Sequence, residues 1–274
     1  MIVAPVTYQG AKGRLADDIV RVMKPDHSKR FYDLCCGSGA VSVALVNSGF
    51  PASKITMVDS GPWGAFWRAM GDGSFSLERF AARVALVPKD PRLIKDYLVG
   101  LHRQKPKVDD FVYDFLLLQA GSFGAKPISG GPDLGWSAAT FRSLWEPTAT
   151  SNRRSHVNPM MPMPDTIMDR VSKIVPAMKG VCGIHGPAQF AHIEFDSTVY
   201  IDPPYHGTAG YGDSIDVLDV AEKLRAAGVA CWVSEGERLS DSFIKLSEGR
   251  KKGGISGNRK TANQEWLSYF GPPL

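Results

Sequence analysis

Four consecutive residues carry the clearest chemical signal in the sequence: Asp202, Pro203, Pro204 and Tyr205. They follow the apolar run 198–201, and since proline cannot continue a central strand, the plainest interpretation is a strand end. Their chemistry is more distinctive. The Asp202 carboxylate and the Pro203 carbonyl could accept both hydrogens of an exocyclic amine, which would free the nitrogen lone pair to attack a sulfonium methyl group. Tyr205 could stack on the face of the base.

A glycine turn between an apolar strand and an apolar helix is the second signal. Strand 31–34 leads into Gly37 and Gly39, and a helix over 40–46 follows. Glycines allow a backbone to approach a ligand closely. Two glycines at this spacing occur in many turns, so this motif alone is weak evidence for binding.

Two acidic residues flank this turn in a pattern typical of a βαβ unit. Asp33 lies within the first strand, and Asp59 ends a second apolar run, 55–58. An acid at the end of the second strand can accept both hydroxyls of a ribose. A helix N-cap is the alternative role for Asp59. Together with the glycines, the two acids favour a nucleotide-like ligand.

Basic and aromatic residues are mixed in three further segments. Lys12 lies between glycines before a predicted helix, where a solvated helix start is as good an interpretation as a substrate contact. Basic side chains interleaved with aromatic ones are typical of a surface that binds nucleic acid, although Trp136 and Trp145 could instead belong to the core. The residues expected to contact DNA are Arg142, Arg153, Arg154, Lys251, Lys252, Arg259 and Lys260. For the last four, a solvated surface loop is the alternative.

The order of predicted elements indicates an α/β protein with an insertion. We expect a discontinuous catalytic domain over 1–72 and 166–274, interrupted by a mostly helical target-recognition region over 73–165. In the inserted region the pattern predicts helices at 76–86, 91–104 and 108–119, followed by a Gly-, Pro- and Trp-rich stretch. Beyond it we expect helices near 165–178 and 215–227, strands at 180–184, 198–201 and 229–233, and an edge strand at 265–270.

Composition sets the limits on these interpretations. The 274 residues are 43% hydrophobic and 22% charged, which is typical of a folded globular chain. A net charge of +4 permits a polyanionic partner without requiring one. No secretory signal or long apolar run is visible, and the four cysteines lack disulfide or metal spacing, so we expect a cytoplasmic protein with reduced thiols and no bound metal or membrane association.

Taken together, these motifs and their order resemble the Dam-type family of adenine-specific DNA methyltransferases, over nearly the whole chain. The resemblance implies a Rossmann-like fold that binds S-adenosylmethionine and flips its target base out of double-stranded DNA. By resemblance, Asp202, Pro203, Pro204 and Tyr205 form the catalytic pocket. The residues that would contact the cofactor are Tyr8, Lys12, Asp33, Cys35, Gly37, Gly39, Asp59, Phe190 and Asp202.

The sequence also departs from the family at four positions, which are Ala11, Cys35, Gly61 and Gln189. Three alternatives therefore stay open: methylation of cytosine at N4, methylation of RNA, and a non-catalytic DNA-binding protein on the same scaffold. A nicotinamide enzyme is disfavoured because the third glycine of its fingerprint is missing. A cognate restriction nuclease is a candidate partner, the setting would be a bacterial or phage-infected cell, and the chain would be a monomer or dimer.

Overall fold

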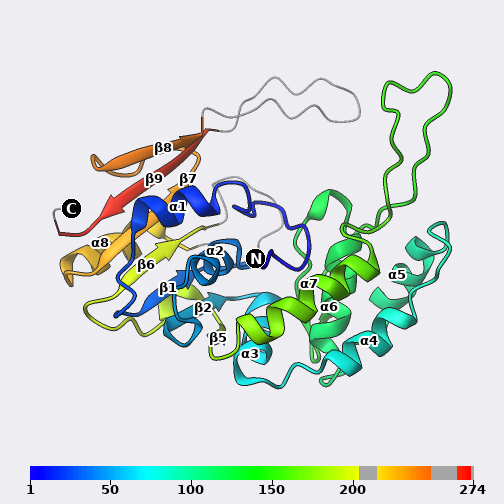
Figure 1. Cartoon of the computed structure of the whole chain (residues 1–274), viewed down its shortest axis with the longest axis horizontal. Coiled ribbons are helices and arrows are strands. Elements are labelled where there is room, and N and C mark those ends of the chain that lie inside the picture. The colour runs from blue at the N-terminus through cyan, green and yellow to red at the C-terminus, as the bar shows by residue number, and fades with distance from the viewer. Residues whose placement is uncertain (204–214, 248–263, 273–274) are drawn as a thin grey trace.

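A seven-stranded, mostly parallel sheet forms the centre of the computed structural model, which describes residues 1–203, 215–247 and 264–272 (Figure 1). The strand order is β5-β2-β1-β6-β7-β9-β8. The first five strands of that order are parallel, whereas β9 runs antiparallel to both β7 and β8. The strands are β1 (Phe31–Leu34), β2 (Ile55–Asp59), β5 (Cys182–His185), β6 (Thr198–Ile201), β7 (Ala230–Glu235), β8 (Phe243–Ser247) and β9 (Glu265–Phe270).

The central strands are short and apolar because both faces of the sheet are covered. All four residues of β1 are buried. Alternate side chains enter two separate cores: Phe31 packs in the larger cluster, and Tyr32 and Leu34 in the smaller one. Asp33 shares the parity of Phe31 and is the one charged side chain in this strand. The period of two thus places a carboxylate inside the larger core.

Helices cover each face of the sheet. Helices α1 (Ala16–Met23), α2 (Ala40–Asn47) and α3 (Pro62–Asp72) contribute to the larger core, and α8 (Val217–Ala226) buries Ala221 in the smaller one. Helix α2 has little amphipathic character, because its residues 41–45 are all buried. An apolar helix directly after a glycine turn is what the sequence predicted. Short 3-10 turns lie at η1 (Ala52–Lys54) and η3 (Ala188–Phe190).

The region between α3 and β5 gathers to one side of the sheet, where α4 (Leu77–Ala85), α5 (Ile94–His102), α6 (Phe111–Gly121) and α7 (Pro164–Ala177) lie together (Figure 1). It is tied to the sheet layer by an aromatic contact: the rings of Trp63 and Phe115 lie edge to face with centroids 4.9 Å apart. Between α6 and α7 lie η2 (Phe123–Ala125), β3 (Gly130–Gly131) and β4 (Gly135–Trp136).

An excursion of the chain rises away from these helices (Figure 1, green, upper right). Its base is closed by a pair of backbone hydrogen bonds, in which Trp145 and Val157 each donate an N–H to the carbonyl of the other, at 3.0 and 2.8 Å. Helix dominates this region only as far as Gly121, and the rest up to Pro164 is mainly irregular.

Most of the predicted elements are confirmed within a few residues, but the edge strand is wrong. Strand β9 lies between β7 and β8, and β8, which forms this edge of the sheet, was not predicted. The burial of β9 explains the error: its pattern of alternation is compatible with an edge, yet Leu267 through Phe270 are all buried. Half-exposed β8, with Phe243 and Ile244 facing solvent, has the composition expected of the edge.

Candidate functional site

From β1 the sheet is extended to one side by β2 and β5 and to the other side by β6 and β7, so a topological switch point lies between β1 and β6. Parallel sheets bind their ligands at such a point, beyond the carboxyl ends of the strands. The loops at this point are the glycine turn after Leu34 and the segment that begins at Asp202. They are in contact, because the Asp202 N–H donates to the Leu34 carbonyl at 3.2 Å. Two motifs that are far apart in the sequence therefore meet at the edge of the sheet where a ligand is expected.

A buried lysine binds the Asp202 carboxylate. The Lys12 ammonium, whose side chain is 5% exposed, donates to Asp202 Oδ1 and, at 3.3 Å, to the carbonyl of Gly10. It also lies 3.6 Å from Oε1 of Glu265, at the start of β9. That Glu265 oxygen accepts a hydrogen bond of 2.8 Å from the Ser234 hydroxyl on β7. We call Lys12, Asp202, Glu265 and Ser234 the charge cluster.

Burial and neighbouring charge oppose each other in this cluster. Burial raises the pKa of Asp202 to about 6, against a lowering effect of Lys12, and repulsion from Glu265 adds to the rise. Burial alone would lower the pKa of Lys12, but attraction to Asp202, Glu265 and Glu235 outweighs it and raises that pKa above its ordinary value. Near neutral pH the cluster therefore holds a charged lysine and an ionised Asp202.

The glycine turn is shaped by aromatic side chains. At Gly37, which has φ of 48°, an added Cβ would lie 2.9 Å from Cε1 of Tyr8. The Gly37 carbonyl accepts a 2.9 Å hydrogen bond from the Trp67 indole, whose ring lies against Gly39. Tyr8 in turn lies edge to face with Trp63, at 5.6 Å between ring centroids. The turn is thus held by rings that leave no room for a side chain at either glycine.

Replacing Gly39 by alanine is expected to lower the free energy of unfolding by about 2–4 kcal/mol, the sum of left-handed strain and overpacking. With φ of 70°, its new Cβ would lie 2.4 Å from the Trp67 ring and 2.7 Å from Cε of Met57. Thermal and denaturant unfolding would measure the loss. The matched control is Gly73→Ala, which has a similar φ of 78° but nothing within 4 Å. Equal losses in the two variants would contradict steric crowding at Gly39.

Asp59 presents a partly buried carboxylate beside this turn. Its Oδ2 accepts the Gly37 N–H at 2.9 Å and its Oδ1 accepts the Gly61 N–H at 2.8 Å. Burial raises the pKa of Asp59, and these two amide hydrogen bonds oppose the rise. Each carboxylate oxygen can accept more than one hydrogen bond, so Asp59 keeps capacity for a vicinal pair of hydroxyls.

Asp33 lies deeper, beneath the turn. Its Oδ2 accepts a 2.6 Å hydrogen bond from the Ser42 hydroxyl of α2, and the residue is 2% exposed. Burial raises its pKa to about 7, and repulsion from Asp202 and Asp59 adds to the rise. Asp33 thereby joins β1 to α2, and its contribution to the site is electrostatic and structural.

The remaining expected site residues are spread over the molecule. Cys35 adopts φ of 61° at the start of the glycine turn. Phe190 lies in η3, beyond β5, with an 80% exposed side chain. Arg142 is half-buried after Phe141, whereas Arg153 and Arg154 are exposed in the excursion closed by Trp145 and Val157. Outside the described residues lie Pro204, Tyr205, Lys251, Lys252, Arg259 and Lys260.

Two members of the charge cluster were not predicted as site residues: Glu265 and Ser234. A usable signal was present at Glu265, because a charged residue opens an otherwise apolar strand and shares the parity of buried Leu267 and Tyr269. Nothing local in the sequence marks Ser234. Its role depends on the register of β7 with β9, in which it pairs with Leu267.

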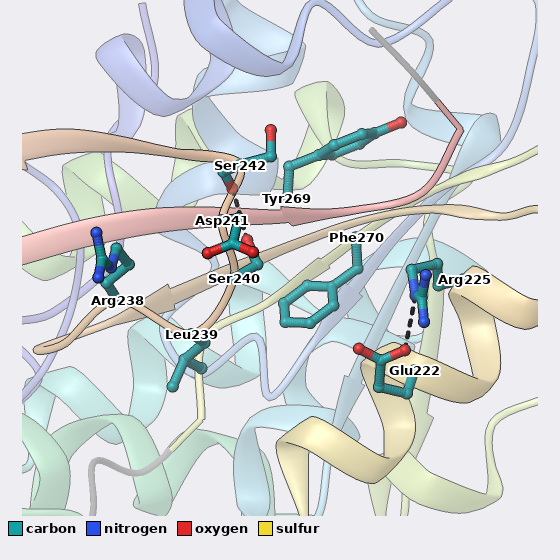
Figure 2. Close-up of a pocket in the computed structure, with 9 residues that line it drawn as sticks. All are labelled: Glu222, Arg225, Arg238, Leu239, Ser240, Asp241, Ser242, Tyr269 and Phe270. Atoms are coloured by element: carbon teal, nitrogen blue, oxygen red, sulfur yellow. Dashed lines mark hydrogen bonds and ion pairs between the residues drawn. The ribbon is translucent and has the colours of Figure 1, made fainter.

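Two surface hollows lie apart from the charge cluster. One, of about 540 Å³, lies between α8, the segment 238–242 and the end of β9, and its lining includes Phe270 and the Arg225–Glu222 pair (Figure 2). The other, of about 300 Å³, is lined by methionines 160, 161 and 163 with Thr7 and Arg170. Neither hollow includes Lys12 or Asp202. The candidate site is therefore identified by its position at the switch point of the strand order and not by the size of a hollow.

The part of the chain that the structure describes contains no group of three His, Cys, Asp or Glu side chains able to hold a metal ion. In the same residues, no helix combines the length and apolar character needed to cross a bilayer. Comparison with protein-family models and with curated proteins finds no match. The class that fold and site define is an α/β protein with a mostly parallel seven-stranded sheet, compatible with a Rossmann-like fold.

Proposed function

We propose that this chain is an S-adenosylmethionine-dependent methyltransferase that modifies the N6 amine of adenine in DNA. One observation carries the proposal: Asp202 and Pro203 lie at the switch point beside the glycine turn, and a buried lysine holds the Asp202 carboxylate. Two acceptors on a rigid segment are suited to an exocyclic amine, which has two hydrogens to donate. The strand order differs from the dinucleotide-binding order 3-2-1-4-5-6 by the antiparallel β9, which disfavours a nicotinamide enzyme.

The residues around the glycine turn fit a nucleoside cofactor. Asp59 has acceptor capacity for ribose hydroxyls, and the turn brings backbone close to any ligand placed there. Ser38, between the two glycines, is 2% exposed, and its hydroxyl has no hydrogen-bond partner among the described residues. A buried hydroxyl without a partner is unfavourable, so a polar ligand at the turn would offset that cost. Tyr8 and Asp59 both lie next to Gly37, so both would contact a cofactor bound at this turn.

In the mechanism, the protein positions and polarises the amine. Bound S-adenosylmethionine supplies a methyl group on a positively charged sulfur, which an amine can attack directly. Asp202 and the Pro203 carbonyl accept the two amine hydrogens, so the nitrogen lone pair is withdrawn from the ring and directed outwards. Lys12 fixes the orientation of Asp202. Since the Asp202 side chain is 19% exposed, the proton that the product nitrogen releases can pass from Asp202 to solvent.

For the DNA partner, the proposal relies on the excursion between Trp145 and Val157. Its Arg153 and Arg154 are exposed, with side chains that hydrogen-bond within the excursion, to Ser155 and Ala149. Arginine guanidinium groups on a projecting segment are suited to backbone phosphates. The expected target-recognition region, 73–165, includes this excursion together with α4, α5 and α6.

The test is methyl transfer from labelled S-adenosylmethionine to unmethylated DNA, followed by digestion and chromatography of the nucleosides. Label in N6-methyladenine is the expected result. Label in N4-methylcytosine would keep the mechanism but change the base, because the same two acceptors can serve that amine. Saturable binding of DNA with no transfer and no binding of the cofactor would replace the proposal by a non-catalytic DNA-binding protein.

Activity and stability are expected to change in opposite directions with pH. Transfer requires ionised Asp202, whose pKa is about 6, so the rate should fall about tenfold per unit below pH 6. An unperturbed aspartate would keep its activity to about pH 4. Because the folded pKa values of Asp202 and Asp33 are raised, the folded state binds the extra protons. The free energy of unfolding should therefore be highest at low pH within pH 4–7, and each of these groups should lower it by up to about 1.4 kcal/mol per unit as the pH rises.

These two profiles can be measured on one preparation, by single-turnover transfer and by denaturant unfolding across pH 4.5–8. A rate that stays constant down to pH 5 would contradict the assigned role of Asp202. A free energy of unfolding that rises steadily towards pH 7 would contradict the raised pKa values.

A further inference from the structure

Lys12 stands between two carboxylates that come from different strands. Asp202 follows β6, Glu265 opens β9, and β7 separates the two strands in the sheet. The ammonium is bound to Asp202 and lies 3.6 Å from Glu265, so it is closer to the first anion than to the second. The Ser234 hydroxyl donates to the same Glu265 oxygen that faces Lys12. Among the described residues, the Asp202, Glu265 and Ser234 side chains therefore all influence the position of this ammonium.

We propose that Glu265, adjusted by Ser234, is a positioning residue that draws Lys12 away from Asp202 and so keeps an Asp202 oxygen available to the substrate amine. This inference rests on the proposed function for its consequence, but the geometry of the cluster stands independently of it. Glu265 touches Lys12 and would act on substrate only through that lysine. Its effect is to determine how strongly the Lys12 ammonium binds Asp202 when Glu265 attracts the same ammonium.

The need for such a balance follows from the chemistry of the lysine. An ammonium is a compact charge with three donors, and Oδ1 of Asp202 already accepts one of them. An amine hydrogen that approaches the same oxygen shares its negative charge with that donor, so a tightly bound ammonium weakens the hydrogen bond that the amine can make. A second carboxylate beside the ammonium weakens its attachment to Asp202 without removing the cation, which burial requires to remain paired. Glu265 is 8% exposed, so its charge acts here with little screening by solvent.

The charged groups around Asp202 define what the variants should do. Lys12 lowers the pKa of Asp202, and Glu265 raises it. The Asp202 charge raises the pKa of buried Asp33, and the charge of Glu235, at the end of β7, raises the pKa of Lys12. Removing the Glu265 charge removes one competing attraction on Lys12, so the ammonium should bind Asp202 more strongly. Removing the Ser234 hydroxyl frees the Glu265 oxygen to attract Lys12 more strongly.

The experiment compares Glu265→Gln and Ser234→Ala with wild type, using ¹³C-labelled aspartate to follow the titration of Asp202 by NMR without ligand. Asp202→Asn assigns the resonance, and Glu237→Gln, an exposed glutamate beyond β7, is the matched control. The glutamine keeps the shape of Glu265 and the acceptor for Ser234. We expect the Asp202 pKa to fall by about one unit in Glu265→Gln. It should rise in Ser234→Ala and stay unchanged in the control.

Methyl transfer supplies the second measurement. In Glu265→Gln the acid limb of the pH–rate profile should move to lower pH with the titration, and kcat should fall roughly ten- to hundredfold with little change in the cofactor KM. A merely structural role would move neither the titration nor the acid limb. The opposite directions expected for the two variants separate positioning from a general loosening of the site, which would shift both in one direction.

An unchanged Asp202 titration in Glu265→Gln, or shifts of the same sign in both variants, would overturn the inference. If Glu265→Gln does not fold, Ser234→Ala decides alone: a rise in the Asp202 pKa supports the inference, and a fall or no change refutes it. Wild-type protein that transfers no methyl group to nucleic acid would refute the proposed function. The NMR titration would still judge the positioning role in that case.

Discussion

Replacing Asp202 by asparagine is expected to lower the rate of methyl transfer by about 10²–10³-fold or more, with the fold intact. The amide keeps one acceptor oxygen but loses the negative charge and presents two donors to an amine that also donates. Lys12 retains Glu265 and the Gly10 carbonyl as partners, so the lysine is not left without an anion. Single-turnover transfer and the circular dichroism spectrum would measure the two parts of this prediction.

The matched control is Asp196→Asn. Asp196 lies just before β6, and Asp202 lies just after it. Asp196 also forms an ion pair with a lysine, Lys29, at 2.5 Å, but this pair lies on the surface. Its left-handed φ of 62° is well suited to asparagine. The control should transfer methyl groups at the wild-type rate. Comparable activity in the two variants would remove Asp202 from the mechanism.

The second large effect is expected for Lys12→Met, which should lower the free energy of unfolding by about 3–5 kcal/mol at pH 7.5. The methionine fills a similar volume but removes the buried cation that lies between the Asp202 and Glu265 carboxylates. For a chain of this size the loss corresponds to a fall in Tm of roughly 10 °C. Because protonation of the carboxylates removes the repulsion, the fall in Tm should be smaller at pH 5.

Lys29→Met tests whether burial is responsible. Lys29 also pairs with an aspartate, yet both side chains are well exposed, and exposed ion pairs contribute little to stability. We expect little change in Tm for this control at either pH. Scanning calorimetry on both variants at pH 5 and 7.5 is the measurement. An equal loss at the two pH values in Lys12→Met would exclude charge as the cause.

Local patterns were sufficient for the strand, the glycine turn and the helix around Gly37, and for the position of Asp202 at the end of β6. Each depends on neighbours in the chain: apolar runs form buried strands, and glycine takes up the positive φ that Gly37 and Gly39 require. Because β1 and β6 are neighbours in the sheet, the glycine turn after β1 and Asp202 after β6 meet at the switch point. These features could be predicted because short-range physics determines them.

The charge cluster could be predicted only in part, because its contacts depend on sheet order. Lys12 and Asp202 are 190 positions apart, and Glu265 reaches them only because β9 inserts beside β7. The residue pattern of β9 is compatible with an edge or an interior position in the sheet. Strand β9 is interior because β8 pairs with its free side. For the same reason Ser234 carries no local signal, although its hydroxyl contacts the charged side chain of Glu265.

The insertion of β9 between β7 and β8 also affects how this protein reaches its working state. The contact between Lys12, which precedes α1, and Glu265, which opens β9, joins distant parts of the sequence, so we expect it to form only after most of the sheet is in place. A ribosome-bound chain that already contains the glycine turn and Asp202 would still lack the second anion. The complete charge cluster is therefore a property of the finished fold, and under the proposed function we expect a nascent chain to transfer methyl groups only after β9 has docked.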